Sequence, residues 1–172
     1  YELDEKRKEW NKDIITELKE ELEKEPDNVK TRANLIWTYL ENDRISEAEE
    51  LLKDLPEDYE DRFDYYNLHS SMALAKEEYE TAVGYLNSLV EIAEKLPEDS
   101  EENISRHARV GEMLIRIGYC YFSMDRLDES KEAYDRALKY PQSHIEALNH
   151  LAQISFNRRK YDETIAYARE LI

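Results

Sequence analysis

The chain has 172 residues, of which 41 are acidic and 24 are basic, so its formal charge is −17 at neutral pH. This charge repels bare nucleic acid and anionic membrane surfaces, and it favours neutral or basic partners. Glycine (3) and proline (4) are scarce, whereas 41% of the residues are hydrophobic and 13 are tyrosines. This composition predicts a folded, all-helical protein and argues against disorder.

Three further classes of protein are disfavoured by residue types and segments that the sequence lacks. The single cysteine, Cys120, can form neither an intramolecular disulfide nor a cysteine-based metal cluster. No apolar run approaches the roughly 20 residues that cross a bilayer, and no signal peptide is visible. We therefore expect no membrane association and a cytoplasmic location.

Because the sequence opens at Tyr1 and stops inside an apparent helix, we expect it to be a piece of a longer protein.

The first expected element is a long helix over about residues 3–25, within a leading segment at 1–28. Pro26 follows this helix and ends it. The segment is either the second half of a preceding repeat or a cap on the repeats that follow. Apolar residues recur at every fourth position along it, which predicts one buried stripe: Trp10, Ile14, Leu18 and Leu22.

After the leading helix, matching positions recur with a period of 34 residues. Leu52 and Leu86 are one such pair in the first half, and Ser130 and Thr164 are another in the second half. Between the halves the offset is 48 residues, which is one period plus an insertion of 14. The predicted units are repeat 1 at 29–62, repeat 2 at 63–97, an insertion at 98–110, repeat 3 at 111–144 and repeat 4, apparently truncated, at 145–172.

Each unit is expected to consist of two helices joined by a short polar turn, with a proline after the second helix where one is present. The insertion is expected to lengthen the first helix of repeat 3, which would run over about 101–124 and bend at Gly111. Asp99 or Ser100 is the expected cap of this helix. Two interpretations of the lengthened region stay open: an extension without a role of its own, or a second contact surface.

One pattern resembles a known family. It is Leu114-x-x-Ile117-Gly118-x-x-Tyr121, followed by Ser130-x-x-x-Tyr134-x-x-Ala137 and Pro141. This helix–turn–helix is similar to the tetratricopeptide repeat. The resemblance covers almost the whole chain and is looser in the first two repeats. It implies an all-α, right-handed α-solenoid of stacked repeats with nine helices, one leading and four antiparallel pairs. It also implies that Gly118 lies at a close contact between two helices.

The sequence contains no pattern that indicates catalysis. His144, Glu146 and His150 lie close together, but the HExxH order is absent and a third helical metal ligand is missing. Cys120 lies in an apolar helix without a basic neighbour in sequence, which predicts a buried, unreactive thiol. We therefore expect no enzyme, no catalytic residue, no cofactor and no bound metal.

Binding of another protein is the remaining function, and the resemblance implies that the first helices of the repeats line an inner wall. Asparagines recur at the positions of these first helices that point away from the core. Each carboxamide offers a hydrogen-bond donor and an acceptor to a peptide backbone. The alternative, that these are ordinary solvated helix residues, stays open. The candidate partner-binding residues are Asn34, Trp37, Asn67, Ser71, Arg116, Tyr119, Asn149, His150, Gln153 and Asn157.

Two function classes follow from these residues. One is a non-catalytic module that binds a peptide or helix of a partner protein in a concave groove. The other is a regulatory or peptide-sensing module of a larger enzyme or receptor. Members of the family that hold the C-terminal carboxylates of chaperones use a Lys/Asn/Asn/Lys/Arg set. The matching residues here are Ala33, Trp37, Leu68, Glu112 and Arg116. Only Arg116 fits the set, so a chaperone tail is not an expected partner.

Overall fold

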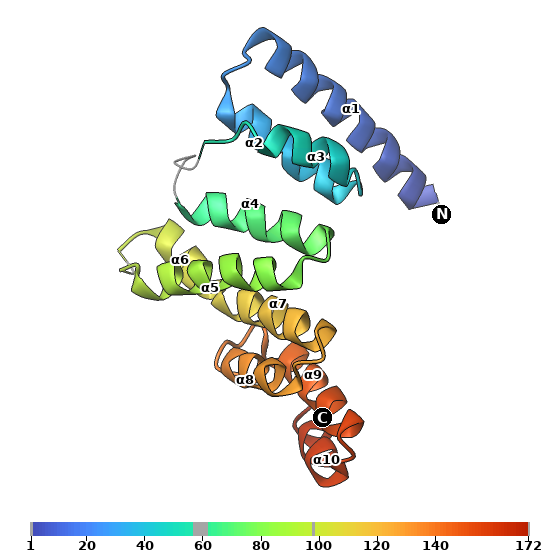
Figure 1. Cartoon of the computed structure of the whole chain (residues 1–172), viewed down its shortest axis with the longest axis vertical. Coiled ribbons are helices and arrows are strands. Elements are labelled where there is room, and N and C mark those ends of the chain that lie inside the picture. Colours follow the sequence, from blue (N-terminus) through green and yellow to red (C-terminus); the bar gives the residue numbers. More distant parts are fainter. Residues whose placement is uncertain (1, 57–61, 98, 172) are drawn as a thin grey trace. The chain divides into compact units, whose positions relative to one another are not determined.

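The computed structural model describes residues 2–56, 62–97 and 99–171, with side chains from residue 12 onward. Over these ranges the chain forms ten α-helices and no strand, which confirms the expected all-α fold (Figure 1). The chain divides into two compact units, Tyr1–Glu78 and Tyr79–Ile172. The helices are α1 (Glu2–Lys24), α2 (Val29–Glu41), α3 (Ile45–Leu52), α4 (Arg62–Ala75), α5 (Tyr79–Lys95), α6 (Glu101–Ala108), α7 (Val110–Ser123), α8 (Leu127–Ala137), α9 (His144–Asn157) and α10 (Tyr161–Glu170).

In the first unit, α2 is the central helix and contacts α1, α3 and α4. Leu35 and Ile36 of α2 are almost completely buried. From α1, Ile15 enters the same core and Leu18 packs against it. The predicted stripe placed Ile14 in the core, but Ile14 is only half-buried and the neighbouring Ile15 is buried. The side chain of Trp10 lies outside the described residues.

Arg32 ties the ends of two other helices to α2. Its Nη1 donates a hydrogen bond to the carbonyl oxygen of Asp54 at 2.7 Å, just after α3. Its Nη2 donates to the carbonyl oxygen of Pro26 at 2.6 Å, just after α1. One guanidinium thus satisfies two backbone acceptors that the helices themselves leave unpaired.

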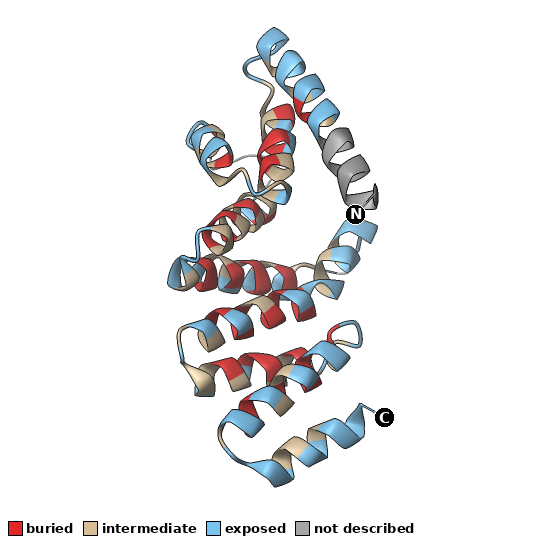
Figure 2. Cartoon of the chain, turned by 90° about the vertical axis from the view of Figure 1, so that its right-hand side faces the viewer, coloured by how far each residue is buried: buried red, intermediate tan, exposed pale blue. Residues whose placement is uncertain are grey.

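In the second unit, α7 packs between α5 and α8, and α9 packs against α8 and α10. The sequence of α7 is apolar on most sides, and eight of its residues are buried, including Leu114, Ile117 and Gly118. By contrast, no residue of α10 is buried, and Figure 2 shows that helix in the exposed and intermediate colours alone. The core of this unit therefore centres on α7.

The expected long helix over 101–124 is wrong, because the chain forms two helices, α6 and α7, separated at Arg109. Both helices contact α5, and α7 also packs against α8 and α9. Asn103 of α6 donates to the carbonyl oxygen of Pro97 at 3.0 Å, which holds α6 to the end of α5. In α7, Gly111 lies so close to the side chains of Tyr140 and Ser143 that no Cβ would fit. The break at Arg109 lies two residues before Gly111, and the described residues form ten helices in place of the expected nine.

The turn inside each repeat has the same backbone geometry four times. One residue of each turn has φ near +58°, the left-handed region that is unfavourable for residues other than glycine. The next residue donates its N–H to a carbonyl five residues earlier, as Arg126 does to Tyr121 at 2.8 Å, which is the Schellman arrangement. These left-handed residues are separated by 34, 48 and 34 positions, which confirms the period and the insertion: Asp43, Glu77, Asp125 and Arg159.

We expect Arg159→Gly to raise the free energy of unfolding by about 0.5–1 kcal/mol. The left-handed conformation costs an L-residue about 1–2 kcal/mol, and part of the gain is offset by the greater backbone entropy of glycine in the unfolded chain. Chemical denaturation followed by circular dichroism measures the change. The control is Asn157→Gly, two residues earlier within α9, which should not raise stability. Equal gains for both variants would contradict the explanation.

Candidate partner-binding faces

Four candidate binding residues lie in the first unit, on α2 and α4, which contact each other. Asn34 is exposed, whereas Trp37, Asn67 and Ser71 are half-buried. Trp37 packs against the hydrophobic core of this unit, so part of its ring surface is already used. Asn34 is therefore the most accessible carboxamide on this pair of helices.

The other six candidates lie in the second unit, on α7 and α9. These two helices also contact each other, so the structure brings the two groups onto neighbouring helices. Tyr119 of α7 is 47% exposed. On α9, a row of exposed amide side chains follows one face at intervals of four residues: Asn149, Gln153 and Asn157.

Arg116 is the one cation among the candidates. It is half-buried on α7, and burial lowers the pKa of its guanidinium, while the carboxylate of Glu112 acts in the opposite direction. Arginine nevertheless remains protonated throughout the physiological range. Arg116 thus supplies a partly desolvated positive charge and several hydrogen-bond donors on the helix that neighbours α9.

His150 is held by an aromatic stack. Its ring lies 4.6 Å from the ring of Tyr134, with an angle of 8° between the planes. Tyr134 is 1% exposed, and its ring also lies against the backbone of Gly118. His150 therefore contributes to the packing between α8 and α9 in addition to any contact with a partner.

The sequence analysis missed Tyr79 as part of this region. Its ring makes an edge contact with Tyr119, with 6.0 Å between the ring centres. Tyr79 begins α5 directly after a turn. In the 34-residue alignment its position is a packing position between helices, so it is not counted among the candidate binding residues. A second exposed aromatic contact joins Phe156 of α9 to Tyr161 of α10, also at 6.0 Å. Aromatic side chains thus accompany the polar candidates on α7 and α9.

The titratable groups that the sequence analysis considered for chemistry are engaged in structural contacts. The Nδ1 of His144 lies 2.9 Å from the carbonyl oxygen of Leu138. Cys120 is buried, and burial raises the pKa of its thiol to about 11. Within the described residues, no group of three or more His, Cys, Asp and Glu side chains is arranged to hold a metal ion. None of the described helices is both long enough and apolar enough to span a bilayer.

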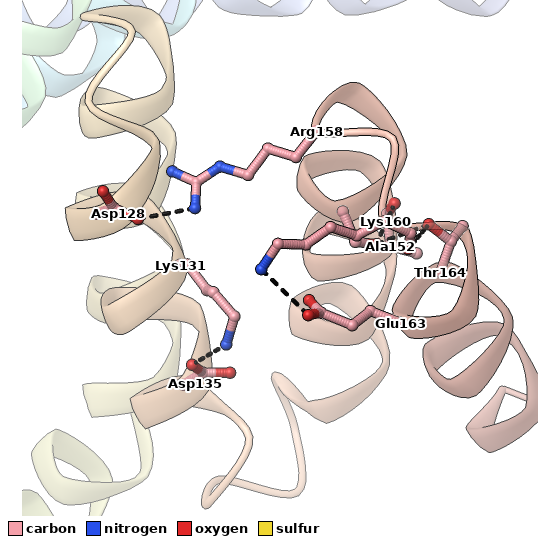
Figure 3. A network of polar contacts seen from close by, with 9 residues as sticks. Asp128, Lys131, Asp135, Ala152, Arg158, Lys160, Glu163 and Thr164 are labelled. Carbon is pink, nitrogen blue, oxygen red and sulfur yellow. Dashed lines mark hydrogen bonds and ion pairs between the residues drawn. The ribbon is translucent and has the colours of Figure 1, made fainter.

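Polar contacts away from the candidate faces connect repeats 3 and 4 (Figure 3). The Nη1 of Arg158 lies 2.7 Å from the Oδ1 of Asp128 on α8. Within repeat 4, Lys160 pairs with Glu163 at 3.1 Å. Lys131 of α8 pairs with Asp135 of the same helix at 2.6 Å. Of these pairs, Arg158–Asp128 is the one that joins the loop between α9 and α10 to α8.

Sequence models described as tetratricopeptide repeat match residues 13–72 and 111–144, together more than half of the chain. No protein in a comparison with curated sequences matches the chain.

Solved structures share the fold at low sequence identity. A crystal structure of the protein MamA has a TM-score of 0.69 and 22% identity, over 98% of this chain and 85% of that one. PilF of Pseudomonas aeruginosa has a TM-score of 0.70 and 15% identity, over 98% of this chain and 71% of that one. A tetratricopeptide protein of Thermus thermophilus has a TM-score of 0.53 and 18% identity, over 91% and 79% of the two chains.

Proposed function

Because the chain belongs to the tetratricopeptide repeat family, whose usual role is to bind other proteins, we propose that it binds a peptide or helix of a partner through the faces of its first helices. The observation that carries this proposal is the exposed amide row Asn149, Gln153 and Asn157 on α9. The neighbouring helix α7 carries Arg116 and Tyr119. We propose no catalytic role and no cofactor.

The chemistry of these side chains suits a polypeptide. A carboxamide donates and accepts at once, as the backbone of an extended peptide does. Tyr119 and Phe156 offer exposed ring surface for apolar side chains of the partner. The formal charge of −17 favours a neutral or basic partner over an acidic one, and it opposes nucleic acid and anionic membranes. Glu112 stands where a carboxylate-binding clamp needs a lysine, so a chaperone tail is not the proposed partner.

The proposal is tested with a peptide selected on the full 172-residue chain from a random-sequence display library. We expect Asn149→Ala/Gln153→Ala to weaken its binding about tenfold, because two hydrogen bonds worth about 0.5–1.5 kcal/mol each are lost. Isothermal titration calorimetry measures the affinity. The variant should be as stable as the parent, since exposed helical amides gain slightly from replacement by alanine.

Two comparisons make this test specific. Asn87→Ala removes an exposed amide from α5, a second helix, and should leave the affinity unchanged. Asn34→Ala/Asn67→Ala examines the first unit in the same way. If the α9 double variant and the first-unit double variant both bind as tightly as the parent, the proposal is wrong for both units.

A further inference from the structure

The exposed side of α10 carries a row of apolar side chains. Ile165 is 49% exposed, and Tyr161 and Leu171 are also exposed large hydrophobic residues. Ala168 completes the row and is exposed as well. One border of this row meets α9. Thr164, which lies between Ala168 and Leu171 around the helix, has its hydroxyl 2.9 Å from that of Ser155. Tyr161 makes an edge contact with Phe156. Despite these contacts the large apolar side chains of the row remain exposed, and Figure 2 shows α10 in the exposed and intermediate colours.

Equivalent positions on α5 show what such a row does elsewhere in the same unit. Val83 and Leu86 of α5 align with Ile165 and Ala168 of α10 by the repeat spacing. Val83 is 5% exposed and Leu86 is fully buried, in a helix that packs extensively against α7. The row on α10 therefore has the composition of a face that another helix covers.

The charge around α10 differs from that of the remaining chain. Residues 144–172 carry equal numbers of acidic and basic side chains, so the whole formal charge of −17 lies in residues 1–143. A second copy of this chain would be repelled by most of the acidic surface but meets no net repulsion at repeat 4. The charged residues of repeat 4 are Glu146, Arg158, Arg159, Lys160, Asp162, Glu163, Arg169 and Glu170.

The charged residues of α10 are placed so that two antiparallel copies of the helix bring opposite charges together. Asp162 lies in the first turn and Arg169 in the last turn, and both are exposed. They are seven residues apart, about two turns, and so lie on the same edge of the apolar row. When two copies of α10 run antiparallel about a two-fold axis near Ile165, Asp162 of each lies opposite Arg169 of the other. The helix dipoles are also opposed in this arrangement.

We infer that the apolar row of α10, with Asp162 and Arg169 at its edge, is a dimer interface on which a second copy of this chain docks antiparallel. The contact is isologous, because the same residues of both copies meet. It lies on a second helix, apart from the amide row on α9, so it is tested without any peptide. Its failure therefore leaves the proposed function standing.

Cross-linking tests the contact directly. In the Ile165→Cys variant of the full chain, the two introduced thiols lie close to the two-fold axis and should form a disulfide between copies, with dissolved oxygen as the oxidant. The native Cys120 is buried with a raised pKa, so it should give little background. The control is Ile104→Cys on α6, where the parent residue is 52% exposed. Linked dimer that forms no faster in Ile165→Cys than in this control would overturn the inference.

Sedimentation equilibrium tests the same contact without a cross-link. The mass of the parent chain should rise from one copy toward two with increasing concentration, whereas Ile165→Glu should remain at one copy. Asp162→Arg should weaken the dimer, and Asp162→Arg/Arg169→Asp should restore it by exchanging the paired charges. Circular dichroism checks that each variant is folded. A parent that remains a single copy at every concentration, or a dimer that the exchanged pair does not restore, would contradict the antiparallel interface.

Discussion

Gly118→Leu is expected to lower the free energy of unfolding by about 1–3 kcal/mol, although leucine is the better helix former. A Cβ at position 118 would lie 2.5–2.8 Å from three ring atoms of Tyr134. That ring is buried and stacked on His150, so it cannot rotate into solvent without breaking the stack. The packing of α7 against α8 therefore decides the sign of the effect. Urea unfolding followed by far-ultraviolet circular dichroism measures it.

Gly84→Leu is the matched control, because Gly84 is also a helical glycine and is exposed. No atom lies within 4 Å of the position that its Cβ would occupy. At Gly84 the substitution should raise the free energy of unfolding by about 0.5–1 kcal/mol, because glycine has the lower helix propensity and no neighbour is displaced. If Gly118→Leu is as stable as the parent, or if both variants are destabilised alike, close packing at Gly118 is not the cause.

Tyr134→Ala is expected to have the largest effect, about 3–5 kcal/mol, the range for removing a buried aromatic side chain. The ring joins α8 to Gly118 of α7 and to His150 of α9, so its loss leaves a cavity between three helices. The measurement is again unfolding in urea. Tyr161→Ala, at an exposed tyrosine of α10, is the control. Measured at a concentration where the chain is a single copy, it should cost less than about 1 kcal/mol.

Tryptophan fluorescence adds a second measurement to this prediction. Both tryptophans, Trp10 and Trp37, belong to the first unit. Fluorescence therefore reports on that unit, whereas circular dichroism reports on the helices of both. If the urea midpoints of Tyr134→Ala, by fluorescence and by circular dichroism, both equal those of the parent, the stack around Tyr134 does not stabilise the second unit.

Much of the fold follows from the sequence because repetition and helix punctuation are local signals. The offset between Ser130 and Thr164 predicts the period, and the four left-handed turn residues confirm it. The contact at Gly118 is also predictable, since a glycine in a helix needs a compensating gain in packing. Neither conclusion requires knowledge of distant contacts.

The features that sequence reasoning missed depend on contacts between segments. The break between α6 and α7 falls at Arg109, where neither a proline nor a side-chain cap marks it in the sequence. Trp37 occupies an outward column, yet a large ring reaches back to the core of its own unit. Tyr79 joins the candidate region only through its contact with Tyr119. The roles of the amide row stay predictions, because exposure alone does not identify a ligand.

The repeated turn has a consequence for how this chain tolerates change. The hydrogen bond that defines it joins two backbone groups, and acidic and basic residues both occupy the left-handed position. The side chain at that one position can therefore vary, but a gain or loss of one residue in the turn would rotate the second helix out of register. The insertion of 14 residues lies instead after α5, between repeats. In evolution, whole helical hairpins are thus the natural units of duplication and loss, and the joints between them are where new segments accumulate.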